Sequence, residues 1–377
     1  MAGLYIHIPF CKQACYYCDF HFSTDQRFRS EFIIALNREI ELQKSYLSSE
    51  PIDTVYFGGG TPSICSQDEI ASILKTVYSN FSIAKDAEVT LEANPDDLSK
   101  EKLSELKSIG INRLSIGIQS FDDDVLRFLN RAHSTAEALA CLSDARSLGF
   151  NNLSLDLIYA IPGQNLMAWK QNVREALSFS PEHVSCYSLT IEEKTVFGRL
   201  QNKGKFPVIP DEVSAEQFEL LMEMMDDAKY DHYEISNFSK PGFQSRHNSS
   251  YWHQKKYLGV GPSAHSYDGT SRQANVRNNS IYVRSILSDT VPFEREELTR
   301  ANKINEYILT TLRTSWGCNL QKINSDWQFD LLREKEQYIS SLVLDGYAFI
   351  NDHVLILTRK GKLLADKIAV DLFSSED

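Results

Sequence analysis

Residues 4–18 read Leu4-Tyr5-Ile6-His7-Ile8-Pro9-Phe10-Cys11-Lys12-Gln13-Ala14-Cys15-Tyr16-Tyr17-Cys18. The apolar run at 4–8 predicts a β-strand, and the three cysteines fall in the loop directly after it. Cysteines spaced C-x3-C-x2-C in one loop are typical ligands of a soft metal or an iron–sulfur cluster. This stretch therefore predicts the first strand of the fold and a metal centre at the end of that strand.

Beyond this stretch, short apolar runs alternate with segments of helical periodicity as far as about residue 190. Six strand–helix units in series predict an α/β fold in which helices cover a parallel sheet. Periodicity alone leaves open whether the sheet lies flat or curls into an open barrel. We expect strands at 4–8, 53–57, 88–93, 113–118, 152–158 and 183–189, and helices at 28–47, 68–80, 100–109, 135–148 and 166–177.

The alternation breaks down after Thr190, and we expect three regions, at 1–229, 230–295 and 296–377. A helix at 212–228 closes the first region. The second is rich in His, Tyr, Asn, Gly and Ser, and this composition predicts loops that connect the flanking regions across a surface.

The third region predicts a small winged-helix-like domain. Helices are expected at 299–313, 327–337 and 338–344, then a hairpin at 347–357, and a final helix to 373 with Thr358 as its N-cap. Only Arg359, Lys360 and Lys362 cluster there, which favours a packing or lid role over DNA binding.

Composition excludes several classes of protein. Hydrophobic residues make up 42% of the 377 residues and charged residues 24%, which argues against a disordered or coiled-coil chain. No apolar run approaches the roughly 18 residues that span a bilayer, so any membrane contact is expected to be peripheral. The N-terminus lacks the pattern of a secretory signal, which predicts a cytoplasmic protein. The net charge of −12 argues against nucleic acid as a partner.

The seven cysteines fall into two groups. Scattered positions with apolar neighbours predict four buried free thiols, at Cys65, Cys141, Cys186 and Cys318. For the clustered three, a closed zinc site needs a fourth ligand, which His21 could supply. A [4Fe–4S] cluster on three thiolates leaves one iron open, and the aromatic residues around the cysteines favour this second interpretation.

Polar and glycine residues recur at the ends of the predicted strands. A carboxylate or amide within an apolar strand is costly unless it finds a partner, so several at one edge predict a binding site. Arg131 could pair with a ligand carboxylate through its planar fork. The candidates are Gly59, Gly60, Thr61, Glu92, Gln119 and Asp156.

The cysteine spacing, with an aromatic residue before the third cysteine, resembles the signature of the radical S-adenosylmethionine (radical SAM) superfamily. The resemblance implies a partial (β/α)6 barrel and a [4Fe–4S] cluster on Cys11, Cys15 and Cys18. It also implies that S-adenosylmethionine chelates the open iron and is cleaved to a 5′-deoxyadenosyl radical. The turn Gly58-Gly59-Gly60-Thr61 matches the family's contact to the cofactor's amino group.

Further blocks resemble the oxygen-independent coproporphyrinogen III oxidase family. They are residues 5–11, the segments that end in Gln119, Arg131 and Asp156, Pro162-Gly163, and residues 233–238 and 259–265. By matching position, the resemblance implies that the cofactor contacts are Tyr5, Gly59, Gly60, Thr61, Glu92, Gln119, Arg131 and Asp156.

This family contains porphyrin oxidases and HemW-type heme chaperones, and three features resemble the chaperones. Phe20 stands where the oxidases carry a further cysteine, no extension precedes the strand at Leu4, and residues 246–252 resemble the chaperone motif HNxxYW. The chaperone branch implies heme as cargo, a heme-accepting protein and an electron donor. The alternative is an oxidase that converts two propionates of coproporphyrinogen III to vinyl groups.

Within that motif, His247 could ligate heme iron, and Tyr251 and Trp252 could offer flat apolar surfaces to a porphyrin. The residues alone favour another explanation of the motif, a loop anchored by two aromatic side chains with His247 in an ordinary hydrogen bond, and the family resemblance shifts the balance toward heme binding. Other candidates for the iron ligand are His7, His133, His253 and His265.

Overall fold

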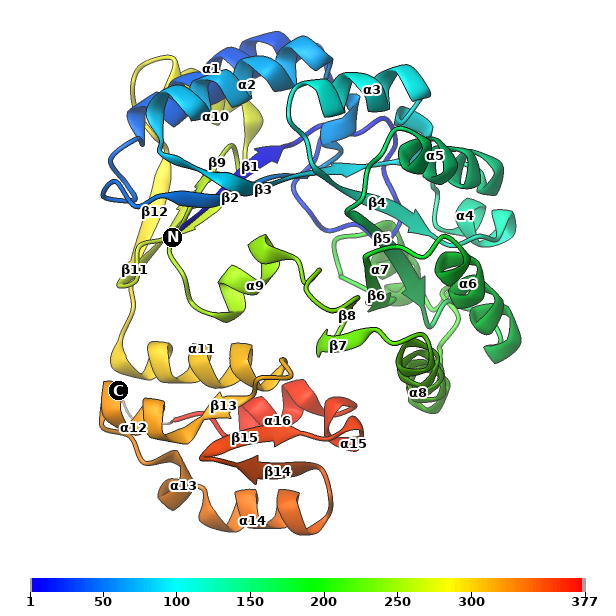
Figure 1. Cartoon of the computed structure of the whole chain (residues 1–377), viewed down its shortest axis with the longest axis vertical. Coiled ribbons are helices and arrows are strands. Elements are labelled where there is room, and N and C mark those ends of the chain that lie inside the picture. Colours follow the sequence, from blue (N-terminus) through cyan, green and yellow to red (C-terminus); the bar gives the residue numbers. More distant parts are fainter. Residues whose placement is uncertain (1, 375–377) are drawn as a thin grey trace.

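The computed structural model describes residues 2–374, and its centre is a twelve-stranded sheet (Figure 1). The six predicted strands are confirmed, and each pairs in parallel with the next one along the chain. These strands are β1 (Ala2–Ile8), β2 (Ile52–Gly59), β3 (Ile83–Ala93), β4 (Arg113–Gln119), β5 (Leu153–Tyr159) and β6 (His183–Ser188).

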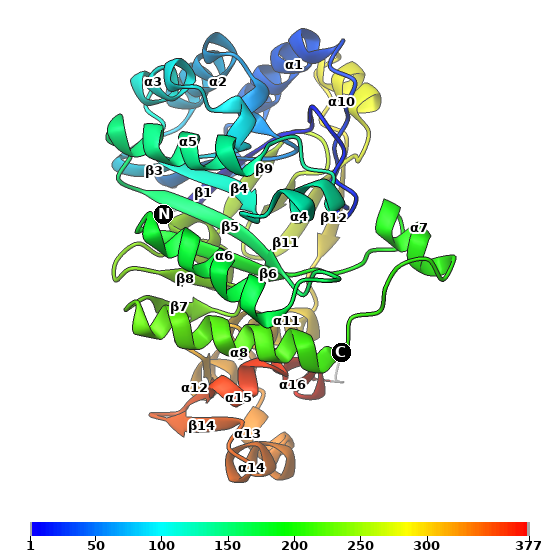
Figure 2. The same cartoon turned by 90° about the vertical axis from the view of Figure 1, so that its right-hand side faces the viewer.

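Helices cover the outer face of the parallel strands (Figures 1 and 2). The capping boxes Ser66–Glu69 and Ser134–Glu137 fix the starts of two of them. The helices of this half are α1 (Arg29–Leu42), α2 (Gln67–Asn80), α3 (Lys100–Ser108), α4 (Asp123–Phe128), α5 (Thr135–Ser147), α6 (Leu166–Ser178), α7 (Val196–Asn202) and α8 (Asp211–Asp227), with short 3-10 turns at Pro62–Ile64 and Pro95–Asp97.

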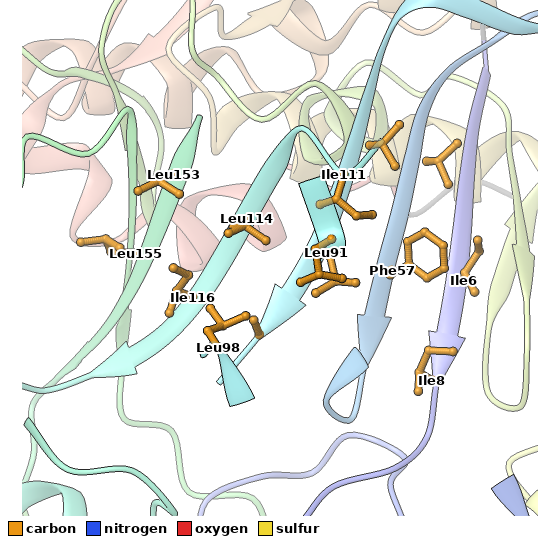
Figure 3. Close-up of a cluster of buried hydrophobic side chains, with 14 of the residues drawn as sticks. Ile6, Ile8, Phe57, Leu91, Leu98, Ile111, Leu114, Ile116, Leu153 and Leu155 are labelled. Atoms are coloured by element: carbon orange, nitrogen blue, oxygen red, sulfur yellow. The ribbon is translucent and has the colours of Figure 1, made fainter. Parts of the chain in front are cut away.

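The main hydrophobic core lies between the sheet and these helices. Figure 3 shows side chains from neighbouring strands, such as Ile6, Phe57 and Leu114, forming one continuous buried layer. Successive residues of a strand point to opposite faces, so Tyr5 and His7 lie on the other side of the sheet from Ile6. That inner, concave side is where the polar side chains of the parallel strands gather.

The sheet is an open barrel: strands from residues 231–297 extend both of its edges, and the outermost strands of the two edges do not pair with each other. The expectation of loops at 230–295 is therefore wrong. β9 (Tyr257–Val260) pairs in parallel with β1, and β10 (His265–Tyr267), β11 (Ser271–Asn275) and β12 (Phe293–Glu297) follow in antiparallel order. At the other edge, β8 (Asn237–Ser239) pairs with β6, and β7 (Asp231–Glu234) is outermost.

Two helices also belong to this segment, α9 (Arg246–Trp252) and α10 (Asn279–Ile286). Helix α9 lies on the concave side of the sheet, where it contacts β1, β2 and α11 (Arg300–Leu312) (Figure 1). Helix α10 packs against α1 on the outer face. The segment therefore adds strands to both edges of the sheet and places a helix on its concave side.

The C-terminal region has a second hydrophobic core, built from residues between Ile304 and Leu372. The three-region division remains a prediction. The hairpin is confirmed, but the helix expected at 327–337 is wrong because Gln328 adopts a left-handed backbone (φ 52°). After α11, the elements are β13 (Cys318–Asn319), α12 (Leu320–Trp327), α13 (Leu331–Glu334), α14 (Glu336–Leu344), β14 (Ala348–Asn351), β15 (Val354–Leu357), α15 (Arg359–Lys362), which Thr358 caps, and α16 (Ala365–Asp371).

No helix within residues 2–374 is long and apolar enough to cross a membrane.

Candidate cofactor site and the neighbouring cavity

A cavity of about 590 Å³ opens at the carboxyl ends of the parallel strands. It brings together every predicted cluster and cofactor residue except Tyr5, which lies on the wall of a second cavity. The residues assembled there are Cys11, Cys15, Cys18, Gly59, Gly60, Thr61, Glu92, Gln119, Arg131 and Asp156.

The three cysteines are unpaired and partly exposed in this cavity. Thr61 Oγ1 donates a hydrogen bond to Cys11 Sγ, and Arg131 Nη1 donates one to Cys15 Sγ, each at 3.4 Å. Burial raises the pKa of Cys11 to about 12 and that of Cys18 to about 11. At Cys11 and Cys18 the protein alone therefore favours the protonated thiol, and a bound metal centre would be needed to hold these two as thiolates.

The Cys3His zinc alternative finds little support in the geometry. His21 Nε2 lies 2.7 Å from Asn279 Oδ1 and is hydrogen-bonded there. Among residues 2–374, no group of three His, Cys, Asp or Glu side chains converges on a single metal position. A cubane cluster makes no such demand, because each thiolate ligates a different iron.

The glycine turn packs directly against the cysteine loop. The amides of Gly60 and Thr61 donate hydrogen bonds to the carbonyls of Ile8 (2.8 Å) and Phe10 (2.7 Å). A Cβ on Gly60 would lie 2.7 Å from the Phe10 carbonyl oxygen, and one on Gly59, whose φ is +109°, would lie 2.6 Å from the His7 ring. The two glycines are therefore needed for packing as well as for access by a ligand.

Two carboxyl groups line the base of the cavity. Glu92 accepts hydrogen bonds from the Tyr56 hydroxyl (2.7 Å) and the Gly59 amide (3.2 Å), and Asp156 accepts one from Ser115 (3.5 Å). Burial is the main reason that the pKa of Glu92 rises to about 7 and that of Asp156 to about 6. A cationic ligand would favour the ionised form of both groups.

Arg131 is more constrained than the sequence suggests. Its Nη2 donates to Asn94 Oδ1 (2.5 Å) and to the Gly117 carbonyl (2.8 Å), and its Nη1 also donates to the Tyr17 hydroxyl (3.4 Å). Its Nε is buried and has no hydrogen-bond partner among the described residues. Nη1 and Nη2 are therefore already engaged within the protein, and Nε is the donor that remains for a ligand. The pairing of Arg131 with a cofactor carboxylate stays a prediction.

Helix α9 carries the HNxxYW-like motif to a second cavity, also of about 590 Å³. Tyr251 and Trp252 line this cavity, but His247 does not. His247 is buried, with Nδ1 2.8 Å from Thr54 Oγ1 and Nε2 2.8 Å from the Tyr251 hydroxyl. In this conformation His247 therefore presents no free nitrogen to a ligand, which matches the alternative of an ordinary hydrogen bond, and its role as a heme ligand stays a prediction.

The two cavities share one stretch of wall, Asp19-Phe20, which directly follows Cys18. The side chain of Phe20 is 74% exposed. Sequence reasoning missed Arg272 and Arg277 on the wall of the second cavity, because both lie in the segment that was expected to form loops. The sequence offered one signal for these two residues: they are basic residues close together in a chain whose net charge is −12.

Comparisons with known proteins agree with this geometry. A family model described as the radical SAM superfamily matches residues 5–176. The heme chaperone HemW of Bacillus subtilis (strain 168) is 35% identical over 98% of this chain and 98% of its own length. HemW of Mycobacterium tuberculosis (strain ATCC 25618 / H37Rv) is 34% identical over 97% of this chain and 93% of its own.

Among solved structures, coproporphyrinogen III oxidase (HemN) from Escherichia coli, a radical SAM enzyme, matches with a TM-score of 0.86. The match covers 100% of this chain and 90% of that chain at 23% sequence identity. This likeness shows a shared fold.

Proposed function

Because the chain belongs to the radical SAM superfamily and, within it, to the family of HemW heme chaperones, we propose that it binds heme and passes it to another protein. The observation that carries the proposal is the pair of adjoining cavities. One cavity assembles the cofactor residues and the other presents aromatic rings, so cofactor and cargo can be held at the same time.

The residues of the first cavity fit the cofactors of the superfamily. Cys11, Cys15 and Cys18 would hold a [4Fe–4S] cluster whose fourth iron has no protein ligand. When bound, the cluster supplies an electron to S-adenosylmethionine. The chain's own part is to position the cofactor with Thr61, to balance its positive charge with Glu92 and Asp156, and to donate a hydrogen bond from Arg131 Nε.

The second cavity offers the surface that a porphyrin needs. Tyr5, Tyr251 and Trp252 line it, and flat aromatic rings gain free energy by burying apolar area against a flat ligand. A heme-accepting protein and an electron donor complete the proposed cycle. We also propose a cytoplasmic location, which the seven unpaired cysteines support because reducing compartments keep thiols free.

The test compares heme binding with porphyrin oxidation. Reconstituted protein is titrated with hemin, and in a parallel reaction it receives coproporphyrinogen III, S-adenosylmethionine and a reductant under anaerobic conditions. We expect saturable hemin binding and no protoporphyrinogen IX on chromatography. Catalytic formation of protoporphyrinogen IX would overturn the proposal in favour of an oxidase.

A further inference from the structure

The second cavity combines aromatic walls with two arginines. Arg272 and Arg277 line it together with the rings described above, in a chain whose net charge is −12. A cavity of about 590 Å³ falls within the range of small-molecule and cofactor sites. Apolar rings with a few cationic groups suit a flat ligand that carries carboxylates at one edge.

Three histidines line this cavity, and they differ in what their ring nitrogens already bind. His7 Nδ1 lies 3.1 Å from the Tyr5 hydroxyl, and His7 Nε2 lies 2.9 Å from the His21 carbonyl oxygen. His21 Nε2 is engaged by Asn279, as described above. His265, at the start of β10, is exposed, and its ring makes no hydrogen bond to any residue within 2–374.

The remaining candidates for an iron ligand lie elsewhere. His133 Nε2 lies 3.0 Å from the Ile118 carbonyl oxygen, and His253 stacks on Trp316 with ring centroids 4.5 Å apart. Neither lines the cavity, and His247 is enclosed behind Tyr251. Although the residue is exposed overall, partial desolvation of its ring on the cavity wall and the nearby Arg272 lower the pKa of His265, which favours the neutral imidazole that can ligate a metal.

Each arginine forms an ion pair with a protein carboxylate, and a ligand carboxylate could take the place of that partner. Arg272 Nη2 lies 2.9 Å from Glu306 Oε2, and its Nε is buried without a partner among the described residues. Arg277 Nη2 lies 3.9 Å from Asp19 Oδ1. Both guanidinium groups are partly exposed, so an incoming carboxylate can reach them.

We propose that heme binds in this second cavity with His265 as the axial ligand of its iron and with Arg272 and Arg277 paired to its propionates. This inference rests on the proposed function and adds the position and the orientation of the cargo. Heme in this place lies against Asp19-Phe20, the stretch of wall that the second cavity shares with the cavity of the cluster cysteines.

The experiment titrates hemin into full-length protein with its cluster, and compares wild type with His265→Ala. Difference absorbance against the same protein without hemin gives the affinity, and magnetic circular dichroism reports the axial ligand. We expect His265→Ala to lose the histidine signature and at least about tenfold in affinity. Added imidazole should restore the signature, and His265→Cys should give a thiolate signature instead.

Controls separate this inference from the proposed function. His21→Ala, on the same wall, and His247→Ala should keep the histidine signature. The double variant Arg272→Gln/Arg277→Gln should lose the preference for hemin over its dimethyl ester. If wild type fails to bind hemin, the proposed function falls and this inference falls with it. If wild type binds and His265→Ala keeps both signature and affinity, only this inference is overturned.

Discussion

Arg277 ties the cluster loop to the wall of the second cavity through Asp19. The guanidinium of Arg277 donates a hydrogen bond to the backbone carbonyl oxygen of Asp19 and lies 3.9 Å from its carboxylate. Asp19 follows Cys18 directly, and Arg277 lies between β11 and α10. The contact between Arg277 and Asp19 therefore joins the loop that carries the cysteines to the wall of the second cavity.

We expect Arg277→Gln to loosen the cluster loop. Removal of the guanidinium frees the Asp19 carbonyl, so amide hydrogen exchange should speed up at residues 18–22. Arg272→Gln is the matched control, because Arg272 pairs with Glu306 on α11 rather than with the loop. Equal exchange in the two variants, measured by mass spectrometry, would show that the Arg277–Asp19 contact does not hold the loop.

The three clustered cysteines should be necessary for iron binding. Wild-type protein reconstituted without oxygen should contain about four irons per chain. Replacement of Cys11, Cys15 or Cys18 by alanine should remove the iron and the brown colour, since each thiolate holds a different iron. Cys141→Ala, a buried thiol on α5, should retain both. Stoichiometric zinc without iron uptake in the wild type would contradict the cluster.

Much of the first cavity was predictable because its residues follow strands that the apolar pattern reveals. Cys11, Glu92 and Asp156 sit at or near strand ends, and the carboxyl ends of parallel strands meet at one edge. Tyr5 lies three residues before the end of β1, as Asp156 does in β5, yet it lines the second cavity. The reason is its strand: β1 pairs with β9, whose Tyr257 lines the same second cavity, and the sequence did not predict β9.

The segment 230–295 was not predictable, because its strands bury polar side chains. Asn275 on β11 donates hydrogen bonds to Glu39 on α1 (2.6 Å) and to the Gly261 carbonyl (2.9 Å). Such strands show no apolar alternation, and the partner Glu39 lies 236 residues from Asn275 in the chain. For the same reason, the sequence could not reveal that Thr54 and Tyr251 occupy both nitrogens of His247.

Binding of S-adenosylmethionine should tighten as the pH rises through about 7. Burial raises the pKa of Glu92 to that value, so below it the free protein carries a neutral carboxyl group. The cationic cofactor prefers the carboxylate, and below pH 7 its binding must also expel a proton. Affinity should then fall by up to about tenfold for each pH unit of acidification.

Calorimetry between pH 6 and pH 8 measures this dependence. Glu92→Gln should bind S-adenosylmethionine more weakly at pH 8, and its affinity should depend less on pH. A smaller pH dependence near pH 6 should remain in this variant because Asp156 titrates there. Glu101→Gln, an exposed position on α3, should match the wild type. A Glu92→Gln profile as steep as that of wild type would remove Glu92 as the titrating group.

Replacement of His247 should lower the stability of the fold more than it weakens heme binding. His247→Ala removes a buried ring and leaves the Thr54 and Tyr251 hydroxyls without that partner, which should cost about 3 kcal/mol of unfolding free energy. Burial lowers the pKa of His247 to about 3 from an ordinary 6.5. Below pH 6.5 the His247 side chain is protonated in the unfolded chain but stays neutral in the folded protein. The contribution of His247 to stability is therefore lost as the pH falls from 6.5 toward 3.

The difference in unfolding free energy between wild type and His247→Ala should therefore shrink by about 1.4 kcal/mol for each pH unit below 6.5. Urea unfolding at pH 7 and pH 5.5 measures this change. His253→Ala, which replaces an exposed histidine at the C-cap of α9, should change stability far less at either pH. If His247→Ala proved as stable as wild type yet lost hemin binding, His247 would have to face the ligand after all, and the hydrogen bonds to Thr54 and Tyr251 would have to break when heme arrives.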